Sequence, residues 1–546
     1  MRSTPLVCLV LAAFTGCGGP DLSTEEAVTE LLTPRQQLIR VSVDLRGVHP
    51  SEADLAAVDA NPGLYGDFVD EYMLDPRFRI EMEDMYNRVL RTRTGDTYFD
   101  PAMAGLDPDD LGVADSIGTE PLKLIGHVID QDLPFTEIVL AEYTFADSNV
   151  AAMWDLQRES GSGWTQATYR DGRPMAGVLS STTLWQRYPS SGVNANRHRA
   201  NQVSRMFLCD DYLTRPLEFT RNDTQDLADA DPQDVINQSD TCQSCHSTLD
   251  PLGAHFFGFW WERDVDSLSA MRTYRPQDEL LWESYAGRAP GYFGNPTTGV
   301  RELGSELAAD VRFSDCAVET AVEGLMQYHS NDADWSDLQR HRAAFETGGL
   351  VYRDLIRSVV SSDAYRAKSF VDDTGERIPV VKTVSPRQLA NIIEDKTGYV
   401  LSFDGVDALR TNDMGLATLA GGIDGRFIVN RSYEPSVSSA FVHERLSQAA
   451  GFRVAAHDLN PARTEDATLL VHVSVNHNPE THRVLFEQQI MHLHRTVLGL
   501  PIEADSPQIE ESIALWKQIY SVTSSPTTAW AGVITATLRS PRILFY

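Results

Sequence analysis

The stretch DTCQSCHSTLDPLG, residues 240–253, constrains this chain more than any other segment. Cys242 and Cys245 stand three residues apart, and His246 directly follows the second thiol. This spacing is the attachment signature of c-type haem, in which the thiols form thioether links to the porphyrin and the imidazole binds the iron. The motif therefore predicts one covalent haem c, held by Cys242, Cys245 and His246.

Two other chemistries use a closely spaced cysteine pair. A tetrahedral zinc site would combine Cys242 and Cys245 with Cys209 and a histidine, but the sequence has no second closely spaced pair of ligands. A thioredoxin-like redox pair is expected after a strand in a βαβ pattern, and no strand is predicted before Cys242. Both alternatives stay open, and haem is the preferred interpretation.

The first 17 residues, MRSTPLVCLVLAAFTGC, have the form of an export signal. Arg2 precedes an apolar run too short to span a bilayer, and small residues lead to Cys17. The last four residues, FTGC, resemble a bacterial lipobox. We expect Cys17 to be acylated in an outer-membrane lipoprotein that faces the periplasm or the cell surface, with simple secretion as the alternative.

The remaining cysteines form an even pair. Cys8 leaves with the signal, Cys17 takes lipid, and the two cysteines of the motif take haem, so Cys209 and Cys316 remain in an oxidising compartment. We predict a Cys209–Cys316 disulfide that encloses the haem segment. Two buried free thiols are the alternative.

Charge excludes several classes of partner. The 546 residues carry 46 basic and 78 acidic side chains, a formal net charge of −32, and no basic run stands out. This balance argues against nucleic acid and against binding to an anionic lipid surface. We expect membrane contact through the N-terminal lipid only, and a redox partner protein. The acidic balance permits steering of a partner with a basic surface, but a solvated acidic surface that aids solubility is the preferred interpretation of the charge. The oligomeric state is not predicted.

Helix signals predominate along the chain. TPRQ at 33–36 predicts a helix start with Gly47 as its stop, and SPRQ at 385–388 repeats that start with Gly398 as the stop. The related segments MLDPRF and LRSPRI are expected to close their units alike. The fold class is therefore mainly α and multi-domain, with an embedded cytochrome c-like haem segment.

The predicted organisation has six parts, because 546 residues exceed one ordinary core. They are a lipoprotein signal peptide (1–17), a linker (18–32), an N-terminal helical domain (33–170), a cytochrome c-like haem domain (171–371), a second linker (372–384) and a C-terminal helical domain (385–546). The second linker is predicted from the turn-forming and polar residues of DDTGERIPVVKTV.

The surroundings of the motif predict a partly enclosed site. The helix that carries it is expected to end at Asp250-Pro251, because proline disfavours helical geometry in the residue before it. A backbone carbonyl near that turn would accept the imidazole N–H. The side chains that follow would either exclude water from the porphyrin or fill the core. They are His255, Phe256, Phe257, Phe259, Trp260 and Trp261.

Four downstream residues are candidates for the sixth iron ligand: Met271, His255, Met326 and His329. Met271 is preferred because it stands at a predicted boundary between loop and helix, and methionine raises the potential relative to a second histidine. An open sixth position would instead mean small-ligand binding or peroxidase-like chemistry. Five histidines between 472 and 494 have no recognisable ligand spacing, so we expect packing or exposed histidines there, with a metal site as the alternative.

Several segments follow one another as they do in a bacterial family. They are LIRVSVDLRGVHPSEADLAAV, YMLDPRF, LPFTEIVLAEYTFADSNVAAMW, MAGVLSSTTLW, RANQVSRMFLC, CQSCHSTLDPLG and FSDCAVETAVEGLMQY, within residues 35–366. In this order the chain resembles the planctomycete-type cytochrome c domain proteins, which are large secreted proteins with several domains of unknown function. The resemblance implies covalent haem at Cys242 and Cys245 with His246 axial, cysteines at the positions of Cys209 and Cys316, and no established reaction.

The expected function is electron transfer in the periplasm or at the cell surface by a lipid-anchored protein with one haem c. A haem-dependent oxidoreductase that acts on an extracellular substrate is one alternative. A surface binding or assembly protein with structural haem is another. A single Cys-x-x-Cys-His motif excludes a di-haem peroxidase built on two such motifs, and no catalytic residue is predicted.

Overall fold

The computed structural model describes residues 28–216, 232–259, 267–330, 333–371, 377–411 and 414–546. The predicted signal peptide with Cys8 and Cys17 lies outside these ranges, as do Trp260 and Trp261. The fold is mainly α, as predicted, with 59% of the structure in helices. No helix in the described ranges is both long and apolar enough to cross a bilayer.

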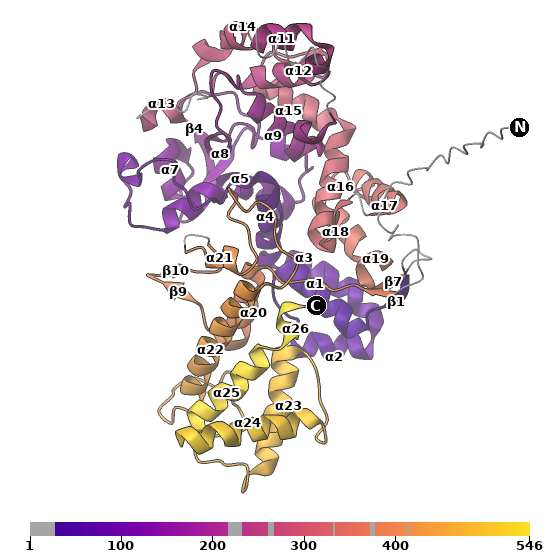
Figure 1. Cartoon of the computed structure of the whole chain (residues 1–546), viewed down its shortest axis with the longest axis vertical. Helices are drawn as coiled ribbons and strands as arrows, with labels where there is room; N and C mark the ends of the chain where they lie inside the picture. Colours follow the sequence, from indigo (N-terminus) through magenta and orange to yellow (C-terminus); the bar gives the residue numbers. More distant parts are fainter. Residues whose placement is uncertain (1–27, 217–231, 260–266, 331–332, 372–376, 412–413) are drawn as a thin grey trace, which may run out of the picture.

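The first group of elements extends from α1, α2 and α3 in the middle of the molecule to α7 and β4, which lie toward the end that carries α12 (Figure 1). Its members are β1 (Val28–Leu31), α1 (Pro34–Arg46), α2 (Glu52–Ala60), α3 (Tyr65–Leu74), α4 (Pro76–Leu90), α5 (Gly112–Asp130), α6 (Glu137–Leu140), β2 (Thr144–Ala146), α7 (Ser148–Trp154), β3 (Leu156–Arg158) and β4 (Thr165–Tyr169). α1 packs against α3 and α4, and α4 packs against α5. β4 lies between β2 and β3 in an antiparallel sheet next to α5.

The second group contains the cysteine motif. Its members are α8 (Thr182–Arg187), α9 (Arg197–Leu208), α11 (Pro232–Gln238), α12 (Asp240–Gly253), α13 (Leu268–Arg272), α14 (Trp282–Tyr285), β5 (Gly291–Tyr292), β6 (Asn295–Pro296), α15 (Val300–Ala309), α16 (Val311–Met326), α17 (Trp335–Thr347), α18 (Tyr352–Val360) and α19 (Asp363–Arg366). Figure 1 shows α11, α12 and α14 together at one end of the molecule. α12 packs against α9, and α16 returns the chain to α4 in the middle.

The third group extends from the middle of the molecule to the opposite end (Figure 1). Its members are β7 (Ala367–Val371), β8 (Arg377–Pro379), α20 (Pro386–Thr397), β9 (Ser402–Phe403), β10 (Val406–Asp407), α21 (Leu416–Leu419), α22 (Val437–Asp458), α23 (Arg483–Leu498), α24 (Pro507–Thr523), α25 (Pro526–Leu538) and α26 (Pro541–Leu544). α25 packs against α22, α23 and α24 at this end, whereas the C-terminus returns to the middle beside α20 (Figure 1).

Both predicted helix starts are present. The side chains of Thr33 and Ser385 accept the N–H of a glutamine at the third helical position, and that glutamine bonds back to the cap backbone. The helices α1 and α20 end as predicted at Gly47 and Gly398, with φ of 68° and 65°. This left-handed conformation favours glycine, which has no Cβ.

Each of the segments MLDPRF and LRSPRI contains the start of a helix. Asp75 and Ser540 are the N-caps of α4 and α26, and each is followed by proline at the first helical position. A cap followed by proline is a start signal, and the helix that LRSPRI starts, α26, is the last element of the C-terminal group.

The hydrophobic cores divide the chain differently from the predicted domains. One core contains side chains from both the 33–170 and the 171–371 parts, such as Leu38, Leu122 and Phe256. The boundary at residue 170 therefore does not separate two cores. The C-terminal helices have their own core, which Val43 of α1 joins.

Both predicted linkers enter the fold where they are described. β1 belongs to the first linker and pairs with β7, and β8 belongs to the second and pairs with the other edge of β7. Lys382 is buried, and its backbone exchanges hydrogen bonds with that of Tyr546. The described part of 372–384 thus stands at the junction of the two cores as a strand and a packed segment.

Candidate functional site

α12 carries the Cys-x-x-Cys-His motif in its first two turns. Ser239 caps the helix by accepting the N–H of Cys242 at 3.4 Å. The expected end at Asp250 was wrong, because the helix continues to Gly253 with Pro251 inside it. Pro251 lies in the last turn, where its missing N–H removes a single helical hydrogen bond.

A carboxylate four residues along the helix holds His246. The Nδ1 atom of His246 lies 2.9 Å from Oδ1 of Asp250, and the imidazole donates because an ionised carboxylate only accepts. Residues four apart share a face of a helix, so the acceptor is this side chain and not the predicted backbone carbonyl. The Nε2 atom has no hydrogen bond to any residue that the structure describes, and it is the nitrogen available to a metal.

Asp250 is itself fixed by arginines. It is fully buried, Nε of Arg197 lies 2.7 Å from its Oδ1, and Nε of Arg288 lies 3.9 Å from its Oδ2. Burial alone would raise the pKa of Asp250, but the hydrogen bonds from His246 and Arg197 outweigh burial and hold that pKa below its usual range. The carboxylate behind the imidazole therefore stays ionised and accepts the proton of Nδ1, which leaves Nε2 to face a metal.

The two cysteines of the motif are free thiols and half-buried. They lie three residues apart on one side of α12, and Cys245 packs against the main core. Two thiols outside any disulfide and an imidazole oriented through Nδ1 are the donor set that c-type haem requires. The residues present therefore fit the cofactor predicted from the motif.

The zinc alternative loses one of its ligands. Cys209 and Cys316 form the predicted disulfide, with the two sulfurs 2.10 Å apart, so Cys209 offers no thiolate to a metal. The described ranges contain no group of three or more histidine, cysteine or acidic residues that could hold a metal ion. The thioredoxin-like alternative also lacks its context, because α11 and not a strand precedes α12.

The structure does not bring Met271 to the motif. Met271 lies on α13 and lines a cavity of about 650 Å³ together with Gln186, Arg187 and His198. Figure 1 draws α13 apart from α12. The preference for Met271 relied on its order in the sequence, which does not determine where α13 packs.

The other candidates for the sixth position are engaged elsewhere. Nδ1 of His255 lies 3.0 Å from the Leu252 carbonyl, and Nε2 lies 2.6 Å from Oγ1 of Thr297. Burial lowers the pKa of His255 to about 4, so it is a neutral, hydrogen-bonded core residue. Met326 is buried in the main core, and the side chain of His329 is 85% exposed.

The aromatic run after the motif packs in the interior where it is described. Phe256 and Phe259 belong to the main core, and the ring of Phe256 lies 4.4 Å from that of Trp185. Phe257 packs with Ala195 and Ala286 in a smaller cluster. The described part of this run is therefore core packing, one of the two predicted alternatives.

Four of the five histidines between 472 and 494 lie in two separate ring pairs, to which His494 does not belong. The rings of His472 and His492 meet edge to face at 5.7 Å, and those of His477 and His482 stack at 4.5 Å. No third ligand completes either pair among the residues described. Their arrangement agrees with the interpretation as packing or exposed histidines.

Sequence reasoning missed Asp250 and Arg197 as members of the site. The i,i+4 spacing from His246 to Asp250 was a readable signal, whereas Arg197 reaches the site only because α9 packs against α12. Comparisons with models of known protein families, with characterised proteins and with solved structures find no match for this chain.

Proposed function

We propose that the protein is an exported, lipid-anchored c-type cytochrome with one haem, which transfers electrons outside the inner membrane. The observation that supports it most directly is the arrangement on α12. Two free cysteines stand three residues apart, and the Nδ1 atom of His246 is engaged by a buried carboxylate. Haem c, when bound, supplies a one-electron iron couple.

Residues of α12 would bind the cofactor, and a residue of α9 would hold one of them in place. Cys242 and Cys245 would form the thioether links, and His246 would bind the iron through Nε2. Asp250 fixes the ring orientation and the tautomer of His246, and Arg197 in turn fixes Asp250. A ligand held in this way needs little rearrangement when the oxidation state changes.

The sequence and the disulfide support the proposed location outside the inner membrane, and the charge supports the proposed kind of redox partner. The N-terminal signal with Cys17 is typical of an outer-membrane lipoprotein, and a Cys209–Cys316 disulfide persists in an oxidising compartment. The net charge of −32 would steer a redox partner with a basic surface.

One observation favours a haem-dependent oxidoreductase as the second candidate. His198 lines the cavity of about 650 Å³, and its neighbour Arg197 holds Asp250 behind His246. A cavity of this size accommodates an organic substrate. The N-terminus of α9 would thus stand between the proposed haem and a substrate.

The test is periplasmic expression with a cytochrome c maturation system, followed by mass spectrometry and absorption spectra with and without reductant. We expect one covalent haem and rapid reversible reduction. The Cys242→Ser, Cys245→Ser double variant should be colourless, and the matched Cys209→Ser, Cys316→Ser double variant should keep its haem. A colourless wild-type protein overturns the proposal, and turnover of an organic substrate selects the oxidoreductase.

A further inference from the structure

A cavity of about 160 Å³, lined by charged and apolar residues, lies between the N-terminal and C-terminal cores and is built by elements other than α12. Its walls come from α4, the end of α16, the start of α20 and residues within 409–411 and 417–431, with one residue each from α1 and α5. Five arginines and four acidic residues line it: Arg88, Arg93, Arg387, Arg410, Arg431, Asp44, Glu81, Asp84 and Asp115. The charge left in the cavity depends on which of these side chains pair with one another and which have no oppositely charged partner.

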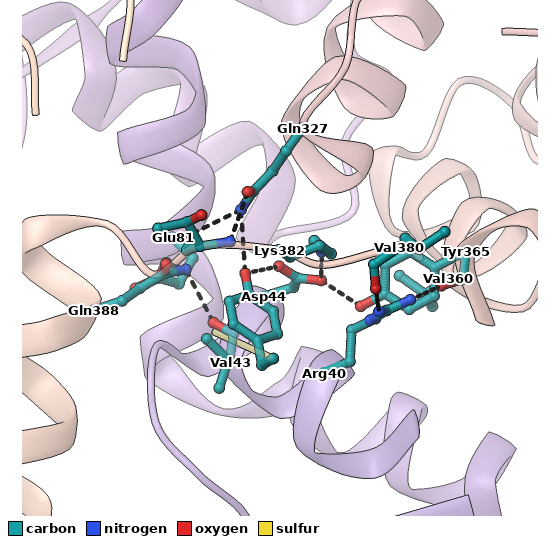
Figure 2. A network of polar contacts seen from close by, with 12 residues as sticks. Arg40, Val43, Asp44, Glu81, Gln327, Val360, Tyr365, Val380, Lys382 and Gln388 are labelled. Carbon is teal, nitrogen blue, oxygen red and sulfur yellow. Dashed lines mark hydrogen bonds and ion pairs between the residues drawn. The ribbon is translucent and has the colours of Figure 1, made fainter. Parts of the chain in front are cut away.

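Several of these charges are balanced within the protein. Asp84 is shared by Arg93 and by Arg387, whose Nε lies 2.7 Å from Oδ2 of Asp84. Asp44 is neutralised by the buried Lys382, and Figure 2 shows this pair beside the cavity residues Gln327 and Gln388.

Arg410 also has carboxylate partners. Its Nη1 lies 2.8 Å from Oδ2 of Asp407, and it pairs with Glu394 of α20. The cavity arginines whose charge is not yet paired with a carboxylate are therefore Arg88 and Arg431.

Arg88 and Arg431 form no ion pair with a carboxylate in the part of the chain that the structure describes. Tyr433 positions both of them. Nη1 of Arg88 lies 3.1 Å from the Tyr433 hydroxyl, and the guanidinium of Arg431 lies 5.2 Å from the ring centroid. Burial lowers the pKa of Arg431, and the nearby charge of Arg88 lowers it further. Two guanidinium groups that contact the same tyrosine and repel each other are stabilised by an oxyanion that binds both.

Glu81 has one buried carboxyl oxygen without a hydrogen-bond partner among the residues that the structure describes. It is 7% exposed, and its Oε2 accepts a hydrogen bond from Nε2 of Gln388 at 3.0 Å. Its Oε1 is buried and has no hydrogen-bond partner. Burial, together with the charge of Asp84, raises the pKa of Glu81 to about 8. At neutral pH Glu81 is mostly protonated, so it does not neutralise the arginines and can donate a hydrogen bond.

We propose that this cavity binds a small organic oxyanion, whose carboxylate or phosphate group lies between Arg88 and Arg431 and whose polar substituent contacts Glu81. The cavity has room for several waters or for one small acid. Met85, Leu325 and Leu409 also line it and would contact the carbon skeleton. This site is independent of the haem.

The experiment is isothermal titration of the full-length protein with succinate, inorganic phosphate and the uncharged analogue succinamide. We expect one of the anions to bind with a single site and succinamide not to bind. Arg88→Gln and Arg431→Gln should each weaken binding about tenfold or more, the effect of losing ~1.4 kcal/mol. Binding of succinate alone identifies a carboxylate ligand, and binding of phosphate alone identifies a phosphate ligand.

Arg170→Gln is the matched control. The Arg170 side chain is 59% exposed and pairs with Asp155 outside the cavity, so the dissociation constant should not change. Arg431→Lys keeps the charge and should retain part of the affinity, and circular dichroism checks that each variant is folded. Absence of binding of both anions to the wild-type protein overturns the proposal. Equal affinity for succinamide, or unchanged affinity in both glutamine variants, also overturns it.

Discussion

Lys382 and Asp44 form an ion pair in the interior although they stand 338 positions apart in the sequence. Their side chains are 2% and 4% exposed, and Asp44 also accepts hydrogen bonds from the hydroxyl groups of Tyr365 and Tyr546 (Figure 2). Asp44 lies on α1, and Lys382 lies just before the C-terminal core. The pair therefore joins the two units at the point where the chain passes from one to the other.

Replacing Lys382 with methionine should destabilise the protein by about 3–5 kcal/mol, because it leaves the Asp44 charge buried without its partner. Adding Asp44→Asn should recover part of this loss. Denaturant unfolding of the wild type and the variants measures the effect. Lys517→Gln breaks an exposed pair with Glu480 and should leave the midpoint unchanged. Equal midpoints for Lys382→Met and Lys517→Gln would contradict a buried role for Lys382.

Asp250→Asn should raise the reduction potential of the haem-loaded protein. The substitution replaces the negative charge behind His246 with a neutral amide. The imidazole then donates less electron density to the iron, so the reduced state is favoured. We expect a shift on the order of 60 mV, which is a tenfold change in a one-electron equilibrium. Redox titration followed by absorption provides the measurement. Asp240→Asn, at an exposed position on the same helix, should leave the potential where it is. An unchanged potential in Asp250→Asn would exclude tuning through this hydrogen bond.

The features that the sequence predicted correctly are local ones. Helices start at Thr33 and Ser385 because the cap side chain and the glutamine accept free N–H groups at the helix start, and the proline between them has no N–H to satisfy. The mainly α fold follows from such signals along the chain. The prediction that α12 ends at Asp250 was wrong, because Pro251 lies in the last turn and removes too little hydrogen bonding to end the helix.

The features that escaped prediction depend on packing between distant segments. Arg197 meets Asp250 because α9 packs on α12, and Lys382 meets Asp44 across most of the chain. No periodicity or spacing encodes these contacts. The same holds for the cavity between Arg88 and Arg431, whose walls come from helices of both units.

Removing the Cys209–Cys316 disulfide should lower stability by about 4 to 5 kcal/mol. The bond closes a loop of 107 residues, and loss of that restraint increases the entropy of the unfolded chain. Unfolding of the Cys209→Ser, Cys316→Ser variant should match that of the reduced wild type. A reducing agent should then have no effect on the variant. A wild-type midpoint that does not respond to reduction would contradict the prediction.

Glu81 should make stability fall as the pH rises. Burial raises its pKa to about 8 in the folded protein, from 4.5 for a free side chain. Between these values the folded state keeps a proton that the unfolded state has lost. The stability from Glu81 is therefore fully present below about pH 4.5 and is lost as the pH rises through about 8, at ~1.4 kcal/mol per unit.

Glu81→Gln removes the ionisable group while its amide oxygen can still accept from Gln388. Thermal unfolding at pH 5 and at pH 8 should show the wild type losing more of its stability over this range than the variant. Glu71→Gln, at an exposed position of α3, should follow the wild type at both pH values. Parallel pH profiles for the wild type and Glu81→Gln would mean that Glu81 is ionised in the folded protein. In that case its charge would oppose an anion in the cavity, so this measurement also bears on the ligand proposed for Arg88 and Arg431.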